Sequence, residues 1–212
     1  MGAEEVMAMD KFIALPQVRQ DHIAAAAMKV FGAVGYKKAY VSDIAAAAGI
    51  SKALIFHYFG NKKTLYFYLI EYTGKIMMAE VWENRETANA DFFEKVVDAT
   101  KKKLAIMNRY PAMTGFLASI FYENDPEVAE QIKTLFSQGG EIRHQITIEG
   151  SDKRKFKDGV DPELVLDILV KYAEGLVGSR LDSIRPMDEI MLEFTRCLNM
   201  LKSNLYKEEF LT

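Results

Sequence analysis

Six side chains able to contact a nucleic acid lie within residues 51–62: Ser51, Lys52, Phe56, His57, Tyr58 and Lys62. A lysine ammonium can donate to a guanine edge or to a phosphate, and a phenylalanine ring can cover a thymine methyl group. Histidine, tyrosine and backbone amide groups donate to phosphate oxygens, which fixes a protein on the duplex. This concentration of donors and aromatic rings indicates DNA recognition.

Catalytic and metal-binding chemistry has little support in the same sequence. The histidines are His22, His57 and His144, and none has a metal-ligand spacing to a cysteine or an acidic residue. No glycine-rich phosphate loop follows a strand, because no strand is predicted. The single cysteine, Cys197, lies in an apolar helical pattern and is interpreted as a small core residue rather than a nucleophile. We therefore expect no enzymatic activity, no metal and no cofactor.

A helix-turn-helix is the element predicted to position these side chains. Its first helix is expected at 42–48, capped by Ser42 and ended by Gly49. Ser51 is expected to cap the second helix, which runs to Phe59. Apolar residues spaced to converge on one small core are Ile44, Ala48, Ile50, Ile55 and Phe59, with Val30 and Phe31 of the preceding helix. The residues left facing outward on the second helix are Lys52, Ala53, Phe56 and His57.

The apolar periodicity predicts an all-α protein of about nine helices. Outside the helix-turn-helix, the helices are expected at 17–34, 62–83, 87–109, 112–122, 126 to at least 137, 161–183 and 187–206. Residues 1–15 are expected to form a disordered or poorly ordered arm, 16–64 a helix-turn-helix DNA-binding domain, and 65–212 a helical ligand-binding and dimerisation body. No apolar run reaches the length of a membrane span, and the single cysteine fits a reducing compartment, so a cytoplasmic protein is expected.

Charge is distributed unevenly along the chain. Residues 16–64 contain seven Lys or Arg and two acids, a net charge of +5, so the remaining residues carry −8 of the total of −3. A basic head on an acidic body would orient the head toward a polyanion. The distribution therefore supports DNA binding although the whole chain is acidic.

The stretch VSDIAAAAGISKALIFHYFGNKKTLY, residues 41–66, resembles the DNA-binding segment of the TetR family of bacterial transcriptional regulators. The family pattern has Ile-Ala, then Gly-Val/Ile-Ser, then Leu-Tyr-x-Tyr/His-Phe, then Lys-x-x-Leu, and nearly every position is matched. The upstream VFGAVGYKKA is similar to the end of the family's first helix. Tyr40 departs from the pattern, since many members have Thr or Ser there. The resemblance covers about 50 residues, and the remainder matches only in length and helical character.

The resemblance implies a ligand-responsive repressor that leaves a palindromic operator when a small effector binds. The positions that it assigns to DNA contact are Ser42, Ser51, Lys52, Ala53, Phe56, His57, Tyr58 and Lys62. The Met-rich and aromatic-rich body serves such proteins as a small-molecule receptor, and flexible Met suits an adaptable pocket. We expect an apolar or amphipathic effector to bind among the fourth to seventh helices. Residues assigned to it are Tyr72, Met77, Trp82, Met113, Phe116, Phe121 and Tyr172; the alternative is that they form the core.

A two-fold dimer is expected because one helix-turn-helix makes too few contacts to compete with a genome of non-specific sites. The last two helices carry apolar stripes that the resemblance also assigns to dimerisation, unless they face their own chain's core. The predicted interface consists of Leu164, Ile168, Tyr172, Gly175, Leu176, Ile190, Phe194, Leu198 and Leu201. The expected partner is double-stranded DNA with an inverted repeat.

Two other functions fit parts of the sequence. A helical adaptor could use the aromatic helix to bind a protein, and such an apolar interface would respond little to salt, whereas DNA binding weakens steeply. A regulator of the same fold could also act as an activator or depend on a corepressor.

Overall fold

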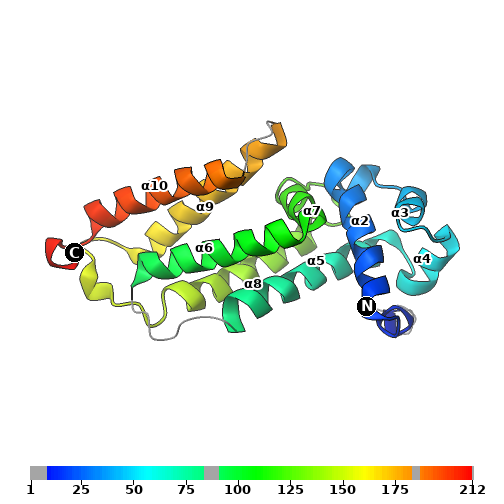
Figure 1. Ribbon diagram of the computed structural model, residues 1–212, viewed down its shortest axis with the longest axis horizontal. Coiled ribbons are helices and arrows are strands. Elements are labelled where there is room, and N and C mark those ends of the chain that lie inside the picture. The colour runs from blue at the N-terminus through cyan, green and yellow to red at the C-terminus, as the bar shows by residue number, and fades with distance from the viewer. Residues whose placement is uncertain (1–8, 84–90, 183–186, 212) are drawn as a thin grey trace. The chain divides into compact units, whose positions relative to one another are not determined.

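A computed structural model describes residues 9–83, 91–182 and 187–211, and these ranges are all-α, as predicted (Figure 1). A helical turn at 9–13 precedes α2. The helices that follow are α2 (Gln17–Lys38), α3 (Val41–Ala47), α4 (Lys52–Phe59), α5 (Lys62–Met78), α6 (Phe92–Arg109), α7 (Pro111–Phe121), α8 (Ala129–Thr147), α9 (Pro162–Asp182) and α10 (Met187–Leu205).

Glycines in the left-handed region end the helices of the N-terminal part. Gly35 has a φ of 73° and breaks the regular part of α2, while Gly49 and Gly60 follow α3 and α4 with φ values of 62° and 71°. These conformations cost glycine little because it has no Cβ. The predicted cap at Ser51 is confirmed, since its hydroxyl accepts from the Leu54 amide at 3.2 Å.

The predicted cap at Ser42 is wrong. The N-cap of α3 is Tyr40, in extended backbone and without a side-chain hydrogen bond, so Ser42 falls inside the first turn. Its hydroxyl donates instead to the Asp43 carboxylate at 3.2 Å. The helix begins earlier because Val41 is a core residue, 8% exposed, and must lie on the buried face.

Two other boundaries differ from the sequence prediction, and a third cannot be compared with it. The α-helical part of α5 ends at Met78, and a π-helix, η1 (Ala79–Glu83), continues it. The predicted start of α6 at residue 87 lies outside the described residues, which resume at Asp91, whose carboxylate accepts from the Glu94 amide at 3.1 Å. A turn at 126–128 delays the start of α8 to Ala129.

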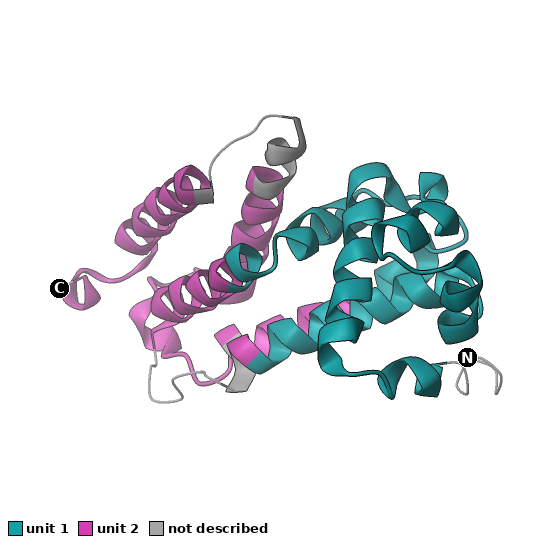
Figure 2. Ribbon diagram, turned by 45° about the vertical axis from the view of Figure 1, so that its right-hand side comes forward, with its two compact units in different colours: residues 1–79, 106–134 teal, residues 80–105, 135–212 magenta. Residues whose placement is uncertain are grey.

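The chain divides into two compact units, residues 1–79 with 106–134 and residues 80–105 with 135–212 (Figure 2). In unit 1, α2 packs on α7 so closely that a Cβ added to Gly32 would lie 2.8 Å from the carbonyl carbon of Gly115. Aromatic rings fill the space beside this crossing: Phe31, Tyr36, Tyr66 and Phe116. Unit 1 thus joins the helix-turn-helix to α5 and α7 through one core.

The core of unit 2 is a second aromatic cluster made of Phe92, Phe93, Phe156 and Tyr206. Beside it lies Asp91, 4% exposed, which accepts from the Lys155 ammonium at 2.9 Å. Burial opposes ionisation of Asp91, but the hydrogen bonds from Lys155 and from the Glu94 amide, with the charge of Lys202, outweigh it and hold its pKa below the ordinary value.

Cys197 packs, half-buried, against the core of unit 2, which agrees with its prediction as a small core residue. Burial raises the pKa of its thiol, which disfavours the nucleophilic thiolate. Among the helices that the structure describes, none is both long enough and apolar enough to cross a membrane.

Candidate nucleic-acid interface

The turn between α3 and α4 is closed by backbone hydrogen bonds around Gly49. The Gly49 amide donates to the Ala46 carbonyl at 3.2 Å, and the Ile50 amide donates to the Ala45 carbonyl at 3.0 Å. These bonds satisfy carbonyls that the end of a helix leaves without partners. The chain then runs in an extended conformation through Ser51, and α4 begins at the next residue. The hydrogen bonds around Gly49 therefore fix α3 relative to α4.

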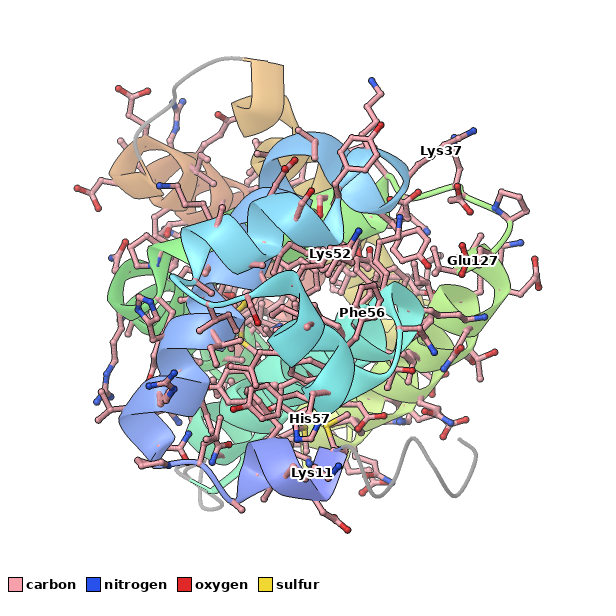
Figure 3. All side chains as sticks on the ribbon, turned by 90° about the vertical axis from the view of Figure 1, so that its right-hand side faces the viewer. Lys11, Lys37, Lys52, Phe56, His57 and Glu127 are labelled. Carbon is pink, nitrogen blue, oxygen red and sulfur yellow. The ribbon has the colours of Figure 1, made fainter. Side chains whose placement is uncertain are left out.

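One face of α4 is buried and the other is exposed, as the sequence predicts. Ile55 and Phe59 are 1% and 0% exposed and pack into the head with Ile44 of α3. The outward face has four exposed residues, which are Lys52, Ala53, Phe56 and His57. Seen end-on, Lys52, Phe56 and His57 follow one another along the side of α4 that faces the viewer (Figure 3).

The exposed ring and the lysine on this face are paired. Phe56 is 40% exposed, and the Lys52 ammonium lies 5.8 Å from its ring centroid. Residues four apart on a helix are neighbours, and a cation over an aromatic face is attracted to it. This pair suits a base edge with a phosphate beside it. The Phe56 ring can cover a thymine methyl group, and the Lys52 ammonium can bind the negatively charged phosphate.

Tyr58 and Lys62, both assigned to DNA contact, also contact residues of other elements of the head. Tyr58 is only 7% exposed, with its ring packed against Phe12 and Phe59 at centroid distances of 5.7 and 6.4 Å. The Lys62 ammonium donates to the Tyr36 carbonyl at 3.0 Å and lies 4.2 Å from the Tyr36 ring centroid. Both residues therefore help to hold α4 and α5 in place, and Ser42, Ser51 and Lys52 remain exposed.

Glu123, which follows α7, makes contacts that the sequence does not predict. One carboxylate oxygen accepts from the Tyr36 amide at 2.7 Å, and the other accepts from the Asn124 and Asp125 amides at 3.1 and 2.9 Å. The carboxylate thereby ties the turn after Gly35 to the loop after α7. The separation of 87 residues between the partners leaves no local sequence signal for this contact.

The residues assigned to effector binding have different environments. In unit 1, Met113 and Phe116 are fully buried, Phe121 is exposed, Met77 is half-buried, and the Tyr72 hydroxyl donates to Asp21 at 2.7 Å. Tyr172 lies in unit 2, where its ring stacks on Phe194 with centroids 6.4 Å apart. The side chain of Trp82 lies outside the described part of the chain.

The residues assigned to dimerisation divide between the inside and the outside of unit 2. Those buried in its core are Leu176, Ile190, Phe194 and Leu198, with Tyr172 and Leu201 packed partly against them. Leu164, Ile168 and Gly175 are exposed along α9. The neighbouring helix α10 adds Leu192 and Met200, 64% and 56% exposed, which the sequence stripe did not include.

Comparison with known proteins connects this geometry to a family. Residues 23–69 match the model for bacterial regulatory proteins of the tetR family. The HTH-type transcriptional repressor Rv1474c of Mycobacterium tuberculosis (strain ATCC 25618 / H37Rv) is 39% identical over 62 residues. That match spans 26% of this chain and 33% of the repressor's length.

Solved structures share the fold over nearly the whole chain. A TetR family transcriptional regulator from Chloroflexus aurantiacus J-10-FL superposes with a TM-score of 0.73 at 15% identity, covering 94% of this chain and 98% of its own. The transcriptional regulator FadR from Bacillus subtilis, in complex with stearoyl-CoA, gives a TM-score of 0.67 at 21% identity, covering 86% of this chain and 97% of its own.

Proposed function

Through residues 23–69 the chain belongs to the TetR family of bacterial regulatory proteins, and we propose that it is a DNA-binding transcriptional repressor controlled by a small molecule. The observation that carries the proposal is the outward face of α4, where Lys52, Phe56 and His57 are exposed side by side on a helix whose opposite face is buried. In this proposal residues 16–64 bind DNA, and residues 65–212 bind the effector and form the dimer. The whole protein acts in the cytoplasm.

In the proposed complex α4 lies in the major groove. Phe56 covers a thymine methyl, and Lys52 reaches a guanine edge or a phosphate. His57 and Ser51 donate to backbone phosphates, and Ser42 does so when its hydroxyl turns away from Asp43; these contacts set the register without reading sequence. Lys62 contributes charge at the start of α5 while it holds the turn at Tyr36.

Two copies associate through α9 and α10 in the proposed dimer. Leu164 and Ile168 are exposed on α9, and Leu192 and Met200 are exposed on α10, a helix that packs against α9 (Figure 1). Exposed apolar groups of this kind mark a protein interface. The buried residues of the predicted stripes, such as Phe194 and Leu198, support these helices from within the chain.

An apolar or amphipathic effector releases the operator in this proposal. FadR of Bacillus subtilis, a protein of the same fold, has been solved with stearoyl-CoA, which is an amphipathic molecule. Helix α5 begins at Lys62 in the head and reaches Met77, so a ligand that favours one tilt of α5 changes the separation of two recognition helices. The effect on DNA affinity equals the ligand's preference between the two states, about 1–3 kcal/mol.

Fluorescence anisotropy with labelled random-sequence duplex DNA tests the proposed function. DNA binding predicts measurable affinity that falls steeply as salt rises, because bound phosphates release counterions. The full chain is titrated beside Lys52→Ala, which should bind more weakly. Absence of binding at low salt would contradict the proposal. It would favour the alternative, an adaptor that binds another protein through Phe56.

The effector is tested separately by thermal shift with long-chain acyl-CoA and with fatty acids of graded length. A ligand that binds the folded chain raises its melting temperature. The same ligand should then weaken operator binding. Tighter operator binding with the ligand would instead identify a corepressor.

A further inference from the structure

The helical turn at 9–13 is docked on the recognition helix. Phe12, which is fully buried, lies with its ring centroid 4.6 Å from that of Phe59 and 5.7 Å from that of Tyr58, both in α4. A third ring, Tyr68 of α5, is 5.2 Å away. A phenylalanine side chain buried among three rings contributes strongly to packing. The turn is therefore part of the folded head, although it precedes the residues that match the family.

Gln20 of α2 fixes the other end of this turn. Its side chain, in a residue only 8% exposed, donates to the carbonyls of Ile13 and Leu15 at 2.9 and 2.8 Å. Carbonyls at the end of a helical turn lack partners along the backbone, and a buried amide satisfies them. Contacts at both ends hold the backbone around Phe12 in one position relative to α4.

Lys11 is exposed on this docked turn, next to the buried Phe12. Viewed end-on, it lies beyond His57 on the side of the head that also shows Lys52 and Phe56 (Figure 3). Docking removes much of the conformational freedom of the backbone that carries Lys11, so less entropy is lost when its ammonium binds a phosphate. Asp10 is also exposed on the turn, so its contribution has to be measured separately.

We propose that Lys11 is a DNA-phosphate contact beside the exposed face of α4, positioned by the docking of Phe12 on α4. This proposal rests on the proposed function and extends its interface beyond residues 16–64. Lys11 reads no base in this arrangement and adds affinity for any duplex, because phosphate contacts carry no sequence information. Phe12 is a positioning residue that acts through the turn.

The test measures binding of full-length wild type, Lys11→Ala and Phe12→Ala to duplexes of different sequence over a series of salt concentrations. Lys11→Ala should make the slope of log K against log salt shallower by about 0.9 per head, with sequence preference unchanged. Phe12→Ala retains Lys11 but should make this slope shallower by the same amount, because the lysine is no longer held in position. Circular dichroism checks that the variant is folded. Lys75→Ala is the matched control, an exposed lysine of α5 expected to leave the slope unchanged.

The outcomes separate this proposal from the function on which it rests. If Lys52→Ala weakens binding but Lys11→Ala matches wild type in affinity and slope, the Lys11 contact is wrong and the function stands. If Lys11→Ala lowers the slope and a folded Phe12→Ala does not, the positioning role of Phe12 is wrong. Wild type that binds no duplex overturns the function and the contact together. Asp10→Ala should bind as wild type or slightly more tightly, and weaker binding would contradict a phosphate beside this turn.

Discussion

The exposed face of α4 and the exposed face of α9 and α10 both present apolar side chains, but their surroundings differ. On α4 a single ring, Phe56, stands beside a lysine and a histidine. On α9 and α10 several aliphatic side chains are exposed, with Leu164 57% exposed and Ile168 50% exposed. A lone ring beside a lysine ammonium and an imidazole fits a polyanion with apolar base edges, whereas several exposed aliphatic side chains fit another protein surface. The kind of partner thus follows from what surrounds the exposed apolar group.

The largest effect is expected from Gly175→Arg, which breaks the aliphatic face. A Cβ at Gly175 would meet nothing within 4 Å, so the single chain accommodates the side chain, while the proposed two-fold interface would not. The variant should be monomeric by light scattering and should bind its operator roughly a hundredfold more weakly, since the advantage of two linked heads is lost. Gly139→Arg, at a glycine of α8 that is equally open, is the control and should remain dimeric.

Phe56→Ala tests the cation-flanked face and should cost about 1–3 kcal/mol of specific binding while relaxing the sequence preference. Removing the ring leaves a thymine methyl uncovered but no buried cavity, because Phe56 is 40% exposed. Competition between operator and random duplexes measures the change, and thermal unfolding verifies the head. Unchanged discrimination between these duplexes would show that Phe56 does not face the bases.

Lys62→Ala should weaken binding to all duplexes alike and make the salt slope shallower by about one. A second effect follows from the structure, because the Lys62 ammonium also supports the Tyr36 carbonyl, so the variant should unfold at lower temperature. Lys63→Ala is the neighbouring control. If Lys62→Ala changed the base preference, Lys62 would contact a base, which contradicts its assignment as a phosphate contact that also supports the Tyr36 carbonyl.

The sequence predicts α4 well because the determinants of this helix are local. Gly49, Ser51 and Gly60 each act on neighbouring residues, and the spacing of Ile55 and Phe59 assigns the inward face. Ser42 failed as a cap because burial of Val41 moved the start of the helix.

Contacts between residues distant in the sequence could not be predicted, because no local pattern specifies them. The packing of Tyr58 on Phe12 and the carboxylate of Glu123 at Tyr36 depend on tertiary structure. On α10, three-to-four spacing does not reveal which of two apolar stripes the neighbouring helix covers. Phe194 is therefore buried while Leu192 is exposed.

The smallest effect is expected on the stability of unit 2, which should decrease at acidic pH. The pKa of Asp91 is held low in the folded chain, so its stabilising contribution is present above the unfolded value near about pH 4 and is lost as pH falls through the folded value. Asp91→Asn should unfold at lower temperature at neutral pH and show a weaker loss of stability on acidification. Thermal melts across this pH range measure both. An acid profile identical to wild type would show that Asp91 is not the group that titrates.

Selection of bound duplexes from a random-sequence pool by the full-length chain tests the central claim most directly. A dimeric regulator should enrich an inverted repeat whose half-sites are centred about one helical turn or more apart, since two α4 helices related by a two-fold axis would enter successive grooves. Enrichment should disappear with Gly175→Arg and persist with Gly139→Arg. A pool that shows no enrichment, or a selected site without two-fold symmetry, would contradict a dimeric DNA-binding regulator.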